Sequence, residues 1–226
     1  MTNHIEKQVR LLDIGGGAGV ILSLVAKHLQ NAHNLSIKKF ALDLSPSALT
    51  IQKEKNPDIV VCLNEDLCKS TLGDKEIDLS LMIDVLEHIN EHRQALLELK
   101  RTSKFVIFKV PLQNNLYFSV MNLLTKGKLK KCSIEDGHVN FYDAEHLKAE
   151  IEEFCGRIIE FRYTNVFEYY DQLERSEDID SYEIRKILER NLNKILPKMG
   201  KIFFKISPEL SSKIFEDFIV CLVRCY

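Results

Sequence analysis

The chain has 226 residues, a formal net charge of −2 at pH 7 and 45% hydrophobic residues, which is ordinary for one globular domain. This balance argues against binding of duplex nucleic acid through a strongly basic surface, although it leaves room for a local basic patch. The apolar run near the start is interrupted by Asp13 and glycines, unlike a secretory signal, and no stretch is long and apolar enough to span a bilayer. We therefore expect a cytoplasmic protein.

The six cysteines include no C-x-x-C pair, which argues against zinc and favours reduced, mostly buried thiols. Cys62, Cys221 and Cys225 fall in predicted strands, where free cysteine behaves as a small hydrophobic residue. His88 and His92 have the spacing of two metal ligands on a helix, but no carboxylate stands at metalloprotease spacing beside them. The sequence therefore predicts no metal site.

The first elements along the chain are a buried strand over Val9–Ile14 and a helix over Val20–Leu29, joined by glycines. Glycine is required where the backbone turns with positive φ or where a ligand approaches closely. The helix directs its free N–H groups and positive dipole end into this turn, so a polar, partly anionic ligand is expected there.

The spacing of the glycines separates two classes of ligand. The dinucleotide fingerprint needs glycine or alanine at its sixth position, which is Val20 here, so a nicotinamide or flavin oxidoreductase is disfavoured. The sequence instead has Asp13-x-Gly15-x-Gly17-x-Gly19. This string resembles the first motif of class I S-adenosylmethionine-dependent methyltransferases. The resemblance implies that the turn lies against the methionine part of the cofactor, with Asp13 anchoring its amino group.

A second strand is predicted over residues 37–44, and it places Asp43 beside the glycine turn, where a carboxylate can accept both hydroxyls of a ribose. The string LDLSPSAL resembles the second methyltransferase motif, in which the residue after the acid, here Leu44, covers one face of adenine. Ser45 and Pro46 also have the character of a helix start, with a helix to about Lys55, and the two interpretations are compatible.

The third strand, Ile59–Leu63, is followed by Asp66 and Leu67, in the place where the resembled family binds the adenine amino group. A solvated acidic loop is the alternative. The fourth strand, Ile77–Ile83, leads into Asp84, which is predicted to begin a helix that runs to about Thr102.

The string DLSLMIDVLEHI resembles the fourth motif of the small-molecule branch of these methyltransferases, the kind grouped as types 11, 12 and 23. It implies that the neighbours of Asp84 face the cofactor sulfur and that Glu87 or His88 faces the substrate. GHVNFY resembles a Gly-His segment of the same branch, which would place His138 at the cleft as a base or a substrate contact. A purely structural histidine is the alternative.

A fifth strand is predicted over Lys104–Val110, ending before Pro111. Its Lys109 can either meet an anionic substrate or stay solvated at the edge. The segment 112–136 contains an apolar helix over Leu116–Leu124 followed by Lys126, Lys128, Lys130 and Lys131. It is interpreted as a cap over the cleft, with contact to a membrane surface as the alternative.

The last two strands are predicted over Arg157–Val166 and Phe218–Cys225. The resemblance implies a doubly wound, Rossmann-like α/β fold with seven strands in the order 3-2-1-4-5-7-6, the last antiparallel. We expect one domain over residues 1–226 with cap segments at 112–136 and 168–212, the second a helical cap or a dimerisation element. The family usually has a helix before its first strand, and this chain looks short there.

The combined motifs predict an enzyme that transfers methyl from S-adenosylmethionine to an oxygen or nitrogen of a small molecule or of a glycan- or lipid-linked precursor. His88 and His138, with Glu87 behind them, are the candidate catalytic residues. No asparagine-proline-proline-aromatic string is present, which disfavours adenine or glutamine as the acceptor. The alternatives are a cofactor-binding scaffold without catalysis and an RNA methyltransferase that uses the lysines of residues 126–131, although the overall charge disfavours nucleic acid.

Overall fold

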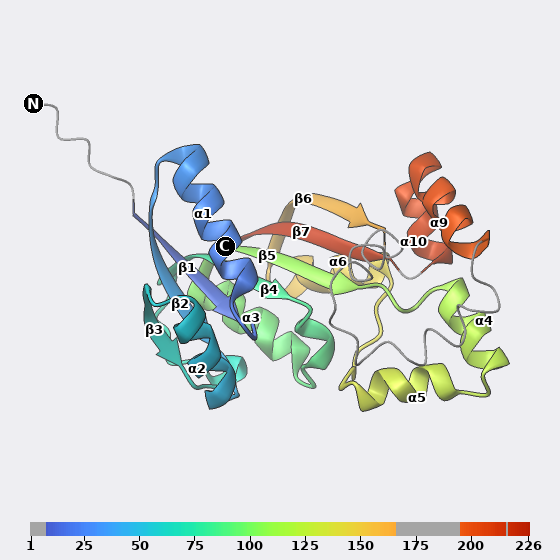
Figure 1. The fold of residues 1–226 in the computed structure, drawn as a ribbon, viewed down its shortest axis with the longest axis horizontal. Helices are drawn as coiled ribbons and strands as arrows, with labels where there is room; N and C mark the ends of the chain where they lie inside the picture. The colour runs from blue at the N-terminus through green and yellow to red at the C-terminus, as the bar shows by residue number, and fades with distance from the viewer. Residues whose placement is uncertain (1–7, 166–194, 216) are drawn as a thin grey trace, which may run out of the picture.

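A seven-stranded sheet in the order β3-β2-β1-β4-β5-β7-β6 organises the protein, with helices on both faces (Figure 1). The computed structural model describes residues 8–165, 195–215 and 217–226. Strands β1 to β5 are parallel to one another, whereas β7 is antiparallel to both of its neighbours, β5 and β6. The predicted Rossmann-like class, strand order and antiparallel last strand are confirmed.

The strands are β1 (Gln8–Ile14), β2 (Ser36–Leu42), β3 (Ile59–Leu63), β4 (Ile77–Ile83), β5 (Ser103–Pro111), β6 (Gly156–Thr164) and β7 (Phe218–Cys225). The α-helices are α1 (Val20–His33), α2 (Pro46–Lys55), α3 (His92–Thr102), α4 (Leu116–Leu124), α5 (Lys128–Glu135), α6 (Ala144–Phe154), α9 (Ile195–Ile206) and α10 (Pro208–Ile214). Two short 3-10 helices, η1 (Leu67–Lys69) and η2 (Leu86–His88), follow β3 and β4.

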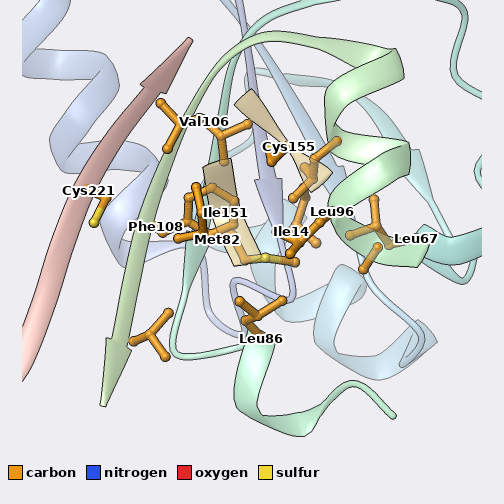
Figure 2. Close-up of a cluster of buried hydrophobic side chains, with 14 of the residues drawn as sticks. Ile14, Leu67, Met82, Leu86, Leu96, Val106, Phe108, Ile151, Cys155 and Cys221 are labelled. Carbon is orange, nitrogen blue, oxygen red and sulfur yellow. The ribbon is translucent and has the colours of Figure 1, made fainter. Parts of the chain in front are cut away.

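Alternation along the strands sends side chains into two apolar layers. On one face, Leu12 and Ile14 of β1 pack with residues of α3 and α6, whereas Leu11 on the other face packs against α1 and α2. Figure 2 shows the first layer, in which Leu96 of α3 and Ile151 of α6 lie close to Met82 of β4. Both layers hold the sheet rigid, so the loops at its carboxyl edge are carried on a fixed frame.

Several predicted boundaries are wrong by one to four residues; strand β2, for example, ends at Leu42 instead of residue 44, and β6 ends at Thr164 instead of residue 166. Helix α1 continues to His33 instead of ending at Leu29, because the polar residues at its end include no breaker until Asn34 takes a left-handed conformation with φ 49°. Strand β5 includes Pro111, which pairs with Phe218 of β7. The missing N–H of Pro111 does not break the pairing, because the N–H of the next residue, Leu112, donates to the Asp217 carbonyl at 2.8 Å.

Four of the six cysteines are buried, as predicted, but Cys62 is exposed. Its strand, β3, is an edge strand, and both Cys62 and Val60 lie on its uncovered face, alternating with the partly buried Val61. Cys221 and Cys225 lie in β7, as expected, and are buried.

Helices α4, α5, α9 and α10 gather beyond the end of β5, away from α1 and α2 (Figure 1). The Phe215 ring that follows α10 lies 6.4 Å from the Tyr117 ring of α4 and 6.0 Å from the Phe203 ring of α9. Much of the predicted cap segment 168–212 lies outside the described residues. Among the helices that are described, none is both long and apolar enough to cross a membrane.

Candidate active site

A cavity of about 700 Å³ opens at the carboxyl edge of the parallel strands, where open α/β sheets bind their ligands. Its walls come from the turns that follow β1, β2, β3 and β4. Six of the nine predicted cofactor residues line it: Gly15, Asp43, Leu44, Asp66, Leu67 and Asp84. Among the predicted catalytic residues, His88 lines the same cavity.

The glycine turn continues strand β1 towards the neighbouring strand, since the Gly15 N–H donates to the Leu42 carbonyl at 2.8 Å. Gly15 has φ +61°, and a Cβ added there would lie 2.9 Å from the Val85 side chain. Gly17 and Gly19 also have positive φ but do not line the cavity. The alternating glycines thus shape the backbone of the turn, and Gly15 alone of the three lies at the cavity wall.

Asp13 lies beneath this turn and not in the cavity. Its side chain is 1% exposed, and its Oδ2 accepts a hydrogen bond of 2.6 Å from the Gln52 side-chain amide. A Cβ on Gly16 would lie only 1.9 Å from that oxygen, so the turn closes directly over the carboxyl group. Burial, together with the nearby charge of Asp43, raises the pKa of Asp13 to about 7. Asp13 supports the turn from below, and its anchoring of the cofactor amino group stays a prediction.

The raised pKa of Asp13 predicts a gain of stability for Asp13→Asn at high pH. The unfolded chain releases this proton near pH 3.8 and the folded chain near 7, so the contribution of the wild-type carboxyl group to stability is full below pH 3.8 and is lost as the pH rises through 7. Asparagine keeps an acceptor for Gln52 and stays neutral. At pH 8 we expect the variant to be more stable by roughly 2–4 kcal/mol.

Urea unfolding of both proteins between pH 3.5 and 8 measures this difference, which should shrink to near zero at the acid end. Asp136→Asn provides the control, because Asp136 is exposed and its substitution should leave the profile unchanged. A difference that is independent of pH would contradict the assignment.

Asp43 follows directly after β2 and lines the cavity. Its Oδ1 accepts a hydrogen bond of 2.8 Å from the Ser45 N–H, and the Asn64 amide donates to the backbone carbonyls of Asp43 and Leu44 at 2.9 Å each. Ser45 caps α2 by accepting from Ala48 N–H at 3.3 Å, so the predicted helix start is confirmed. The carboxylate is held at the edge by its neighbours without being covered.

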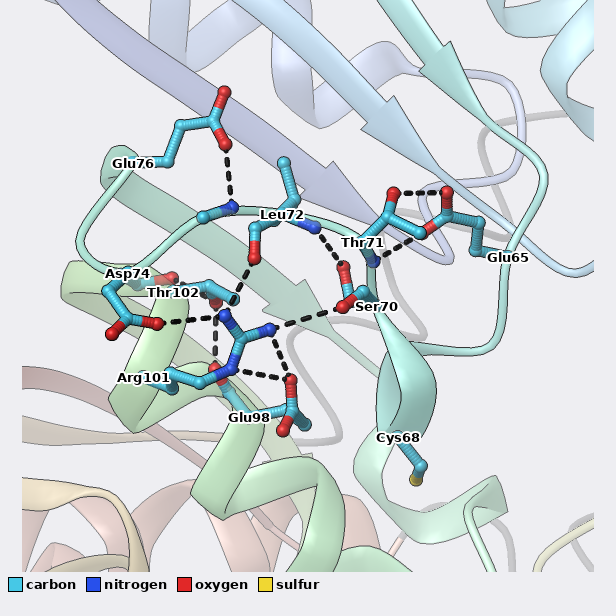
Figure 3. Close-up of polar contacts among 12 residues, drawn as sticks. Glu65, Cys68, Ser70, Thr71, Leu72, Asp74, Glu76, Glu98, Arg101 and Thr102 are labelled. Atoms are coloured by element: carbon cyan, nitrogen blue, oxygen red, sulfur yellow. Dashed lines mark hydrogen bonds and ion pairs between the residues drawn. The ribbon is translucent and has the colours of Figure 1, made fainter.

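Asp66 is carried to the cavity by a loop that is fastened at both ends. Its Oδ1 accepts from the Cys68 N–H at 2.9 Å, while the Glu65 carboxylate accepts from the backbone and hydroxyl of Thr71. Figure 3 shows the Arg101 guanidinium of α3 closing the far side of the loop, with hydrogen bonds to the carbonyls of residues 70 and 72. This network fixes the direction in which residues 65–67 face the cavity.

Asp84 forms an ion pair with Lys109, the residue of the neighbouring strand β5 that pairs with Ile83. The Lys109 ammonium also lies 4.0 Å from the centre of the Phe218 ring and is only 20% exposed. The expectation of a solvated lysine is therefore wrong. The pair neutralises two charges at the edge and sets the carboxylate of Asp84 at the cavity wall.

The helix predicted to begin at Asp84 begins instead at His92, after the 3-10 helix η2. Asp84 has φ +55°, which turns the chain away from a helix. The Asn140 side-chain amide then donates to the carbonyls of Leu86 and Ile89, at 3.2 and 2.7 Å. Because these bonds come from a distant segment, local helix propensity does not decide the conformation here.

The structure brings Glu87, His88 and His138 together, although His138 is far along the chain. One potential ligand atom from each lies within 4.8 Å of the other two, and the two imidazole rings are perpendicular with centroids 4.7 Å apart. The Glu87 carboxylate is 1% exposed, and burial raises its pKa to about 8. His88, with 38% of its side chain exposed, connects this cluster to the cavity.

The GHVNFY segment reaches this place through backbone contacts. The N–H groups of Val139 and Asn140 donate to the Glu87 carbonyl at 2.9 and 3.0 Å. The His138 Nδ1 pairs with Gln113 Oε1 at 2.7 Å, so the segment after β5 also orients this histidine. His92 does not join the cluster, since its Nε2 contacts the Glu150 carboxylate of α6 at 3.2 Å.

Residues that the sequence did not single out complete the site. Glu65 and Val85 line the cavity, Gln52 holds Asp13, and Gln113 holds His138. The adjacency of Glu65 and Val85 to the motif acids was the available signal for them. Gln52 and Gln113 carried none, because their roles depend on contacts between distant parts of the chain.

Comparison with known proteins agrees with this geometry. Residues 12–104, from β1 into the start of β5, match the family model described as "Methyltransferase domain". No curated protein sequence matches the chain.

Three similar solved structures share the fold at low identity. A putative sarcosine dimethylglycine methyltransferase from Galdieria sulphuraria has a TM-score of 0.63 at 14% identity, over 97% of this chain and 79% of that one. Geranyl diphosphate C-methyltransferase from Streptomyces coelicolor A3(2), in complex with S-adenosyl-L-homocysteine among other ligands, has a TM-score of 0.63 at 8% identity, over 98% of this chain and 76% of that one. The [4+2]-cyclase SpnF has a TM-score of 0.58 at 13% identity, over 97% of this chain and 76% of that one.

The domain match and the sheet order agree with each other. Residues 12–104 are similar to methyltransferase domains, and the seven-stranded sheet has the Rossmann-like fold of S-adenosylmethionine-dependent methyltransferases.

Proposed function

We propose that the protein transfers the methyl group of S-adenosylmethionine to an oxygen or nitrogen atom of a small molecule or of a glycan- or lipid-linked precursor. The observation that carries the proposal is the continuity of one cavity from the acids at the strand ends to His88, which adjoins Glu87 and His138. A cofactor site and a group able to activate an acceptor thus share one opening.

In the proposed complex, Asp43 accepts the ribose hydroxyls and Leu44, which is 72% exposed, covers one face of adenine. Asp66 accepts from the adenine amino group, with Leu67 beside it. The glycine turn, supported by Asp13, lies against the methionine part, and Asp84 stands at the wall between cofactor and acceptor. This orientation directs the sulfonium methyl towards the cluster of Glu87, His88 and His138.

The sulfonium is already a good leaving group, so most of the task is to hold the acceptor atom about 3 Å from the methyl carbon. The acceptor atom forms the new bond to carbon as the carbon–sulfur bond breaks, and the electron pair stays on sulfur. The acceptor's proton passes to His88 or His138 acting as a base, with Glu87 behind them.

The surface near the site bears on the class of acceptor. Helix α4 exposes Leu116, Val120, Leu123 and Leu124, and exposed lysines follow on α5. An apolar stripe beside basic residues is typical of a surface that binds an anionic amphiphile, which supports a lipid-linked precursor as the acceptor. A soluble small molecule is the other proposed acceptor.

Two measurements, made one after the other, test the proposal. Calorimetry with S-adenosylmethionine tests cofactor binding, and labelled methyl donor with fractionated cell extract tests transfer. Label in the aqueous small-molecule or organic-soluble fraction supports the proposal, whereas binding without label indicates a scaffold. Label in RNA, with binding that weakens steeply with salt, would favour the alternative based on the lysines of residues 126–131.

Substitution of Asp43 tests the proposed ribose contact. Asp43→Ala is expected to weaken binding of S-adenosylmethionine by about 1.5–3 kcal/mol, through loss of charge-assisted hydrogen bonds. Asp43→Asn is the matched control, because it keeps an acceptor for the Ser45 N–H and should lose less. Calorimetric affinities that are equal in all three proteins would remove Asp43 from the site.

A further inference from the structure

The carboxylate of Glu87 is buried without a hydrogen-bond partner for its Oε2 among the described residues, which favours the binding of a cation. The Glu87 side chain is only 1% exposed. Its other oxygen lies 4.0 Å from the His88 Nε2, beyond hydrogen-bonding distance. A buried carboxylate without a partner is costly, so such a group either keeps a proton or binds a positive ion.

The two histidines supply the remaining donors for a metal ion. One ligand atom from each of Glu87, His88 and His138 lies within 4.8 Å of the other two. Ligand atoms at about 2.1 Å from a common ion are at most about 4.2 Å apart, so small side-chain adjustments would close the set around one ion. Two imidazoles and one carboxylate are ligands that suit zinc and its neighbours among the divalent transition metals.

The surroundings of His138 have the character of a second coordination sphere. Its Nδ1 lies 2.7 Å from Gln113 Oε1, and since a carbonyl oxygen only accepts, Nδ1 carries the proton of the neutral ring. The lone pair is then on Nε2, the usual arrangement for a histidine whose other nitrogen is held by a partner. Gln113 is only 3% exposed, so this orientation is fixed by the interior.

We propose that Glu87, His88 and His138 form a binding site for one divalent transition-metal ion. His88 reaches the cavity wall, so the positions that the protein does not fill face the space where the acceptor would lie. Sequence spacing offers only His92 and the cysteines as partner ligands for His88, so it predicts no metal site. The third ligand comes from a segment that only the tertiary fold brings near.

This inference deepens the proposed function and rests on it for the role of the ion. A bound ion would hold an acceptor oxygen and lower its pKa, so that the proton leaves to water before transfer. The oxygen then forms its bond to the methyl carbon as the carbon–sulfur bond breaks, leaving the electron pair on sulfur. In this arrangement the ion takes over the activation that a histidine base would otherwise supply.

Titration of the metal-free protein with Co²⁺, followed by visible absorption and calorimetry, tests the site. The wild type is expected to bind one equivalent, with d–d bands of a low-coordinate site. Glu87→Gln and His138→Gln should each weaken binding by roughly 10- to 100-fold or more. His146→Gln is the matched control, because His146 also contacts a glutamate, Glu150, but is 59% exposed and outside the cluster.

Absence of a stoichiometric site in the wild type would overturn the proposal, as would Co²⁺ binding that neither Glu87→Gln nor His138→Gln weakens. Circular dichroism establishes that each variant is folded, and His138→Gln serves as the test if Glu87→Gln does not fold. Calorimetry with S-adenosylmethionine is run separately. A wild-type protein that binds S-adenosylmethionine but no Co²⁺ refutes only this inference, whereas a wild-type protein that does not bind S-adenosylmethionine refutes the proposed function.

Discussion

Gly19→Ala is expected to destabilise the protein by roughly 3 kcal/mol, while Gly17→Ala should cost only about 1 kcal/mol. Both glycines have left-handed backbone, with φ +70° and +53°, so the conformational penalty is shared. The difference is space. A Cβ on Gly19 would lie 2.5 Å from Gln52 Cγ and 2.7 Å from Asn56 Nδ2, whereas nothing lies within 4 Å of one on Gly17.

Both neighbours of Gly19 are buried, and Gln52 is the donor that holds Asp13 beneath the turn. The added methyl group therefore displaces Gln52 or Asn56, and neither side chain has free space into which it can move. We expect the affinity for the cofactor to fall together with the stability of the protein. Urea unfolding and calorimetry of the two variants measure this. Equal destabilisation by the two substitutions would mean that positive φ, and not crowding by α2, explains the glycine at position 19.

His88→Ala and His138→Ala are expected to lower turnover by about 10²- to 10⁴-fold while the affinity for S-adenosylmethionine changes by less than about threefold. The reason is position, since both rings lie in the cluster beside the cavity and neither is a predicted cofactor contact. Single-turnover kinetics with the acceptor found by labelling, together with calorimetry, separates the two quantities. His146→Ala should retain turnover. Parallel loss of turnover and affinity would instead make both histidines structural.

The sequence was sufficient to predict the sheet and seven of the fifteen residues that line the cavity. Strands β3, β4 and β7 begin and end at the predicted residues, because short apolar runs bounded by polar or glycine-rich segments specify buried strands. Asp43 and Asp66 line the cavity for the same reason: the carboxyl ends of parallel strands meet at one edge, so an acid placed after each strand is carried there.

The errors share a different physical origin. The sequence does not show that Asp13 is buried beneath the turn, because the direction of its side chain depends on Gln52, which lies on α2. The helix expected from Asp84 is replaced by η2 because Asn140 takes the carbonyls that a helix would use. The burial of Lys109 likewise depends on its contacts with Asp84 and Phe218, which lie far from it in the sequence and which local periodicity does not reveal.

The place of β7 between β5 and β6 has a consequence for the order of folding. During synthesis β6 leaves the ribosome long before β7, yet among the described strands β6 pairs with β7 alone. Until β7 arrives, the edge of β5 and the whole of β6 present unpaired backbone groups. Nascent chains held in that state are vulnerable to association with one another, and we expect this protein to acquire its native form late and to benefit from chaperones that shield strand edges.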